Sequence, residues 1–193
     1  RLGGIYASLA PDHARDSGAD ELVPGLIREA EDLLPDYSII PEWHEKQKAS
    51  VLFSHRGCIR ACGFCAVPKL EGRPFQARPR TSIRHLIHPN HKRVVLWDNN
   101  VLGESHWRDV VAELTELGLQ VDFNQGLDAR LVTDEVAQAL KALWIPAIRL
   151  AYDHPKIGRF VKKALDLLRE AGITRHRMSH VVSYVLFNYK DTP

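Results

Sequence analysis

The sequence has few cysteines, little net charge and no long apolar run. Its three cysteines among 193 residues cannot all pair with one another. They therefore argue against a disulfide framework and favour a reducing compartment such as the cytoplasm. The formal net charge of +2 gives no electrostatic reason to expect binding to nucleic acid or to an anionic membrane. No apolar run approaches the roughly 20 residues that a membrane helix needs, and the first residues lack the pattern of a signal peptide.

The composition that is present fits a soluble globular protein. Apolar residues make up 45% and charged residues 26% of the chain, whose length allows one main domain with a substantial core. The chain begins at Arg1 without a methionine and ends just beyond a strand pattern. We therefore expect it to be a piece of a longer protein.

From Ser50 onward, strand patterns alternate with helix patterns. Buried strands are typically short runs of apolar, β-branched and aromatic residues. Such runs occupy residues 50–54, 92–98, 119–124, 147–153 and 180–188. Amphipathic helix patterns between them occupy residues 105–118, 133–143 and 157–172, with a weaker one at 81–88. Ser105 and Thr133 can cap helix starts, and Gly118 and Gly172 stand where helices commonly end.

This alternation predicts an α/β fold made of parallel βα units with right-handed crossovers. The units can form an open doubly wound sheet or part of a βα barrel, and periodicity alone leaves both possibilities open. In both, ligands bind at the carboxyl ends of the strands. The polar residues there are Asp98, Asn99 and Asn100 after the second strand, Asn124 and Gln125 after the third, and Asp153 after the fourth. Any one of them alone could be a solvated turn residue, but their gathering on one rim favours a site.

All three cysteines lie on one short loop after the first strand, with the spacing Cys58-x3-Cys62-x2-Cys65. Three thiolates so close in sequence can converge on one soft metal centre. His55 could join them in a closed zinc site, although zinc sites usually draw ligand pairs from separated segments. Three cysteines without a fourth suit a four-iron, four-sulfur cluster that keeps one iron open for a substrate or cofactor.

The cysteine spacing, with the aromatic Phe64 just before Cys65, resembles the motif of the radical S-adenosylmethionine enzymes. The resemblance implies a partial (βα)6 barrel, of which residues 46–193 would supply about five βα units. It implies a [4Fe-4S] cluster on Cys58, Cys62 and Cys65, whose open iron chelates S-adenosylmethionine. Reductive cleavage of that cofactor, with electrons from a donor such as flavodoxin or ferredoxin, would give a 5′-deoxyadenosyl radical. The radical would act on an unknown substrate.

Other residues carry over from this family less directly. Phe64 would pack near the cluster and the adenine. The family often has a Gly-Gly-Glu stretch after the second strand, where this chain has Asp98, Asn99 and Asn100; by position these would lie near the methionine end of the cofactor. Asn124, Gln125 and Asp153 could bind ribose or carboxylate, or could form turns and helix caps.

Residues 1–45 resemble the tail of the flavodoxin-like, cobalamin-binding domain that precedes the radical core in one subfamily. The pattern predicts a short strand at 19–23, a closing helix at 26–34 and a linker at 35–43. The resemblance implies cobalamin as a further cofactor of the longer parent protein. The cobalamin-ligating histidine of such domains lies upstream, and His13 does not match it.

The remaining basic residues near the cysteines have a simpler interpretation. We interpret His55 and Arg56 as solvated loop residues, and likewise the basic stretch of Arg73, Arg78 and Arg80. Two alternatives to the radical enzyme stay open: a methylthiotransferase-like enzyme acting on RNA, and a zinc-binding module that uses the same cysteines.

Overall fold

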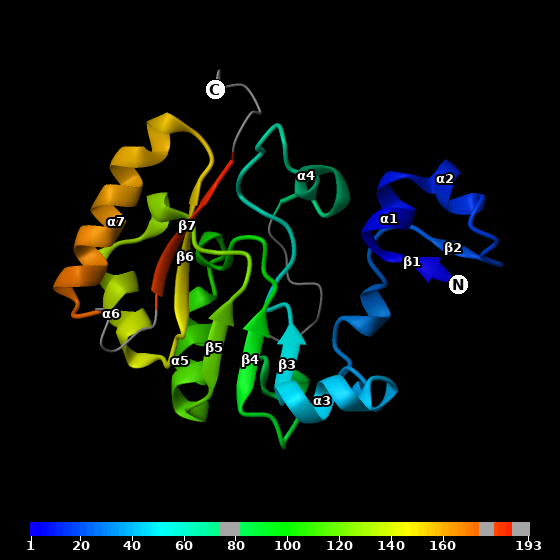
Figure 1. Cartoon of the computed structure of the whole chain (residues 1–193), viewed down its shortest axis with the longest axis horizontal. Helices are drawn as coiled ribbons and strands as arrows, with labels where there is room; N and C mark the ends of the chain where they lie inside the picture. Colours follow the sequence, from blue (N-terminus) through cyan, green and yellow to red (C-terminus); the bar gives the residue numbers. More distant parts are fainter. Residues whose placement is uncertain (74–81, 174–179, 187–193) are drawn as a thin grey trace.

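A computed structural model of the chain describes residues 1–73, 82–173 and 180–186 (Figure 1). Its centre is a parallel sheet in which β3 (Ala49–Leu52), β4 (Arg93–Leu96) and β5 (Gln120–Phe123) pair in that order. A second parallel pair consists of β6 (Ala147–Tyr152) and β7 (His180–Val185). Parallel bridges between Gln120 and Trp144 and between Leu127 and Leu150 join β5 to β6. The five predicted strands are therefore confirmed, and they lie side by side in chain order.

Three helices connect these strands, and their ends agree with the predicted signals except at Ser105. They are α5 (Trp107–Leu117), α6 (Asp134–Ala142) and α7 (Gly158–Glu170). The hydroxyl of Thr133 accepts a hydrogen bond from the Val136 N–H, and Gly118 and Gly172 both have positive φ. The prediction for Ser105 was wrong. Helix α5 begins at Trp107, so His106 takes the capping position, and the Ser105 hydroxyl donates a hydrogen bond to Glu104.

The weaker helix predicted at 81–88 was also wrong over the part that the structure describes. Only the 3-10 turn η3 (Arg84–Leu86) forms there, before Pro89. Other short elements follow the strands: the one-turn α-helix α4 (Val67–Leu70) and the 3-10 turns η4 (Val101–Gly103), η5 (Ala129–Leu131) and η6 (Pro155–Ile157). No helix in the described ranges is long and apolar enough to cross a bilayer.

The hydrophobic core lies between the sheet and the helices. Alternate strand residues such as Val94, Leu96 and Val121 pack with α5, α6 and α7 in one buried cluster. The residues between them point to the other face, where Asp122 lies between Arg93 and Arg149 and accepts a hydrogen bond from each. The sheet therefore has an apolar face under the helices and a charged face opposite.

The first 34 residues form a small lobe beside this sheet (Figure 1). It contains β1 (Leu2–Gly3), α1 (Gly4–Leu9), α2 (Pro11–Arg15) and β2 (Leu22–Val23), and β1 pairs with β2 in parallel. The strand predicted at 19–23 is confirmed in β2. The closing helix predicted at 26–34 was wrong, since only the 3-10 turn η1 (Arg28–Ala30) forms; Pro24, Gly25 and Pro35 flank this short segment.

The predicted linker at 35–43 is partly helical. It contains η2 (Tyr37–Ile39) and the start of α3 (Pro41–Gln47), which ends at Lys48 in a left-handed conformation. The Tyr37 hydroxyl accepts a hydrogen bond from the Val51 N–H on β3. This segment therefore covers the outer edge of β3, near the amino ends of the strands.

Candidate iron–sulfur and cofactor site

The cysteine loop leaves β3 at the carboxyl end of the sheet and returns to its own starting point. The Cys58 N–H donates to the Gly72 carbonyl over 3.1 Å, and the Gly57 N–H donates to Glu71 Oε2 over 2.7 Å. Gly57 has φ +79°, and a Cβ at this position would lie 2.2 Å from the Arg73 carbonyl oxygen. The two ends of the loop therefore touch at a point where only glycine fits.

Asp98 anchors the base of the loop. Its carboxylate is 3% exposed, and it accepts hydrogen bonds from the N–H groups of Ser54 and His55 and from the Ser54 hydroxyl. His55 Nδ1 lies 2.8 Å from Asp98 Oδ1. A buried carboxylate with this many donors has a structural role in the loop. Its predicted contact with S-adenosylmethionine stays a prediction.

The interpretation of His55 and Arg56 as solvated residues was wrong. His55 is only 1% exposed. The Arg56 guanidinium donates to Glu31 over 2.7 Å and to Glu71 over 3.3 Å, and lies 3.4 Å from the centre of the Phe53 ring. Arg56 thus joins the segment before α3 to the cysteine loop. Arg73 is exposed, as expected, and donates to the Ile59 carbonyl; Arg78 and Arg80 lie outside the described residues.

Each of the three cysteines is a free thiol and is half-buried. Two donors point at Cys58 Sγ: the Arg60 N–H at 3.3 Å and the Asn100 side-chain amide at 3.8 Å. The Cys65 N–H donates to the Cys62 carbonyl over 3.0 Å, which turns the chain between these two cysteines. Donors aimed at sulfur stabilise a thiolate, the form that binds iron. The donor set therefore fits an iron–sulfur cluster.

Zinc and an iron–sulfur cluster would use the three thiols differently. Four-coordinate zinc binds all of its sulfur ligands directly, whereas a cluster binds each thiolate through a different iron. The zinc alternative stays a prediction.

Asp128, Arg60 and Arg130 form a charged group beside the cysteines that sequence reasoning missed. Arg60 donates to Asp128 over 2.8 Å, and the Arg130 Nε donates to the same carboxylate over 2.7 Å. Burial opposes ionisation of Asp128, but hydrogen bonds from both arginines outweigh it and lower its pKa. The sequence signal for this group was the polar run after the third strand, because Asp128 and Arg130 follow Asn124 and Gln125 within a few residues.

Arg130 and Asp153 act together on the Cys62 thiol. Burial raises the pKa of Cys62, the charge of Arg130 lowers it, and the charge of Asp153 raises it again. Burial likewise raises the pKa of Asp153, against the charge of Arg130. Asp153, predicted from its position after the fourth strand, thus lies close enough to the cysteine loop to influence it. Whether it binds a cofactor stays a prediction.

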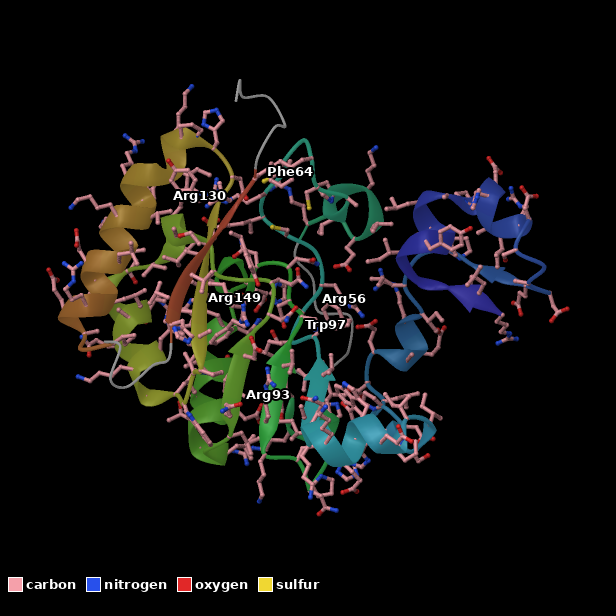
Figure 2. The ribbon with its side chains drawn as sticks, in the orientation of Figure 1. Arg56, Phe64, Arg93, Trp97, Arg130 and Arg149 are labelled. Carbon is pink, nitrogen blue, oxygen red and sulfur yellow. The ribbon has the colours of Figure 1, made fainter. Side chains whose placement is uncertain are left out.

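The other predicted residues lie at the same edge with different partners. The Asn99 amide donates to Glu71 over 2.8 Å. Asn100 is 5% exposed, and its Oδ1 is buried without a hydrogen-bond partner among the described residues. Gln125 is exposed, and its side-chain amide donates a hydrogen bond to the Asn124 side chain. Phe64 is 42% exposed at the rim, on the same side as Arg130 (Figure 2).

These features define an α/β protein whose parallel sheet presents a three-cysteine loop at its carboxyl edge. Among solved structures, the chain is similar to the radical S-adenosylmethionine methyltransferase TsrM from Kitasatospora setae. The TM-score is 0.57 and the sequence identity 15%, both for the structure with tryptophan substrate and a cofactor analogue (aza-SAM) bound and for the one with cobalamin and a [4Fe-4S] cluster bound. The predicted resemblance to radical S-adenosylmethionine enzymes and their cobalamin branch is confirmed as a likeness of fold.

The likeness covers 75% of this chain but only 31% and 32% of the two solved chains. The chain thus spans about a third of the length of the proteins it matches. No protein-family model matches it, and no curated protein matches its sequence.

Proposed function

We propose that this chain holds the cluster-binding part of a radical S-adenosylmethionine enzyme, built as a partial (βα)6 barrel. The observation that carries the proposal is the cysteine loop at the carboxyl end of a parallel sheet, with two donors aimed at Cys58 Sγ. Cys58, Cys62 and Cys65 would hold the cluster. When bound, it would supply the electron that cleaves S-adenosylmethionine into methionine and a 5′-deoxyadenosyl radical.

Asn100 is the residue best placed to meet the methionine end of the cofactor. Its amide nitrogen donates toward Cys58, and its buried Oδ1 is an acceptor in need of a donor. The ammonium group of an amino acid is such a donor. Asp98 serves the loop from the same segment, so we assign the two residues different tasks: Asp98 shapes the loop and Asn100 contacts the cofactor.

The charged group around Asp128 would complete the site. Arg60 and Arg130 both pair with Asp128, and the charge of Arg130 also acts on Cys62 and Asp153, so this group would set the charge around the cluster. The electron donor, the substrate and cobalamin in the small lobe remain parts of the proposal for the longer parent protein. Such a cluster needs a reducing compartment, for which the cytoplasm is our proposal.

Iron analysis after anaerobic reconstitution tests the cluster. We expect about four irons and four sulfides per chain in the unchanged protein. Cys58→Ala, Cys62→Ala and Cys65→Ala should each lose most of the iron. Ala61→Ser is the matched control, because Ala61 is exposed on the same loop, and it should keep the full content. Unchanged iron and sulfide in the triple cysteine variant would contradict the proposal.

Calorimetry with S-adenosylmethionine tests the cofactor. On the reconstituted protein, Asn100→Ala should weaken binding about tenfold or more, because it removes the buried Oδ1 that would accept a hydrogen bond from the ammonium group of the cofactor. Glu170→Ala, an exposed change at the end of α7, should leave the affinity unaltered. Equal affinity in the Asn100 variant would place the methionine end elsewhere.

A further inference from the structure

Three histidines meet at the amino end of the sheet, far along the strands from the cysteine loop. His44 lies on α3, and His88 and His91 lie in the turn that leads into β4. Their ring centres are 5.0 Å apart for His44 and His88, 4.8 Å for His44 and His91, and 4.5 Å for His88 and His91. One ring nitrogen from each lies within 4.8 Å of the other two, the only such group of possible metal ligands among the described residues.

The side chain of His91 has a buried ring nitrogen without a hydrogen-bond partner among the described residues. The residue is 2% exposed, its Nδ1 lies 2.8 Å from Ser50 Oγ, and its Nε2 is buried without a hydrogen-bond partner in the described part of the chain. Ser50 Oγ also accepts the His88 N–H over 2.9 Å. If Nδ1 donates its proton to Ser50, Nε2 presents a bare lone pair, the state that a histidine ligand needs.

The surroundings hold the three rings in place. Tyr37 packs against His91 at 4.8 Å and against His44 at 5.7 Å between ring centres, and its hydroxyl is fixed by the Val51 N–H. The Nε2 of His91, buried without a hydrogen-bond partner among the described residues, is therefore available to bind a metal ion.

We propose that His44, His88 and His91 bind one divalent transition-metal ion of the zinc class, separately from the cysteine loop. Three imidazole nitrogens are a common ligand set for zinc, with a fourth position left for water. Bonds of about 2.0 Å in a tetrahedral site place the nitrogens about 3.3 Å apart, so nitrogens that lie within 4.8 Å of one another need to close by at most about 1.5 Å. Because His44 lies on α3 and the other two lie before β4, the ion would clamp the segment after the small lobe to the sheet.

Metal titration in a background without thiols tests this site. In the Cys58→Ala, Cys62→Ala, Cys65→Ala variant, freed of metal by a chelator, we expect one equivalent of Zn²⁺ to bind and to raise the melting temperature. Co²⁺ should give visible bands of nitrogen ligation without sulfur charge transfer. Adding His44→Ala or His91→Ala should abolish the stoichiometric binding, and adding Ser50→Ala should weaken it about 10- to 100-fold.

The control and a second preparation keep the test decisive. His180→Ala removes an exposed histidine on β7 and should leave zinc binding unchanged. His44 is half-buried on a short helix, so its variant tests the site even where the His91 variant unfolds. If the triple cysteine variant does not fold, the same titrations are done on the unchanged chain with alkylated cysteines. No zinc binding, or binding that survives His44→Ala and His88→Ala together, would overturn the proposal and leave the rings as packing around Tyr37.

Discussion

The buried hydrogen-bonding groups at the two ends of the parallel strands are paired in different ways. At the carboxyl end, carboxylates collect the donors of the chain: Asp98 accepts from Ser54 and His55, and Glu71 accepts from Gly57. At the amino end, histidine rings gather around Tyr37, and His91 has a buried nitrogen without a partner among the described residues. A carboxylate offers several acceptor sites and can fix a loop unaided, whereas a neutral imidazole ring offers a single acceptor nitrogen.

The largest expected effect is the removal of Asp98. Asp98→Ala leaves buried N–H groups and the His55 ring without their acceptor, so we expect a loss of about 3–5 kcal/mol in the free energy of unfolding. Reconstituted iron should fall with it. Chemical denaturation measures the first and iron analysis the second. Glu170→Ala, an exposed change at the end of α7, should stay within about 0.5 kcal/mol. Equal stability of the two variants would break the comparison between buried and exposed acids.

Two glycines, one at each end of the strands, allow the cost of a left-handed backbone to be measured separately from the cost of a steric clash. Gly57 and Gly118 have φ of +79° and +62°, but a Cβ meets the Arg73 carbonyl at Gly57 and nothing within 4 Å at Gly118. Gly118→Ala should cost about 1 kcal/mol from the left-handed conformation alone. Gly57→Ala should cost at least about 2 kcal/mol, because the loop ends must also move apart. Thermal or chemical unfolding of both variants measures the difference, and equal losses would mean that the loop closure yields easily.

Asp128 gives the carboxyl end a pH dependence. Its pKa is lowered in the folded chain, so its charge stabilises the fold above the unfolded value of about 4, and this contribution is lost as the pH falls through the lower folded value. Asp128→Asn should therefore cost about 1–2 kcal/mol at pH 7 and progressively less below about pH 4. Denaturation of both proteins across this range checks it. A difference that does not change with pH would show that the two arginines act on Asp128 by packing alone.

The smallest effect concerns the helix starts. Thr133→Ala removes the hydroxyl that accepts the Val136 N–H at the start of α6, and should cost about 1 kcal/mol. Ser105→Ala, before α5, should cost almost nothing, because that hydroxyl bonds to Glu104. Paired unfolding curves decide this, and a larger loss at Ser105 would restore its role as a cap.

Local patterns predicted the parts of the fold that depend on local forces. The strands and the helix ends at Thr133, Gly118 and Gly172 follow from β-branched runs, one capping hydroxyl and left-handed glycines, which act within a few residues. The weaker helix at 81–88 and the closing helix at 26–34 failed, because their patterns lie beside prolines and glycines that favour short turns. Periodicity cannot weigh such interruptions against a modest apolar stripe.

The sequence predicted where the site residues lie but not the contacts that support them. The three cysteines share one loop, and Asn100 and Asp153 follow strands, as predicted; their roles as ligands stay predictions. His55 looked like a solvated loop residue because nothing nearby in sequence buries it; its partner Asp98 is 43 residues away. The histidines show the same limit, since His44 meets His88 and His91 only through the fold. Contacts between distant segments carry no local signal.

The closure of the cysteine loop bears on how quickly the proposed cluster would assemble. Residues 58–72 form a ring whose ends are joined by the hydrogen bond from Cys58 to Gly72. Closing a free chain of about this length costs on the order of 2 kcal/mol in entropy. In this protein folding has already closed it, so the three thiols share a small volume before any metal arrives. In the proposed cluster, binding of the first iron by one thiol would make binding by the second and third thiols an intramolecular event.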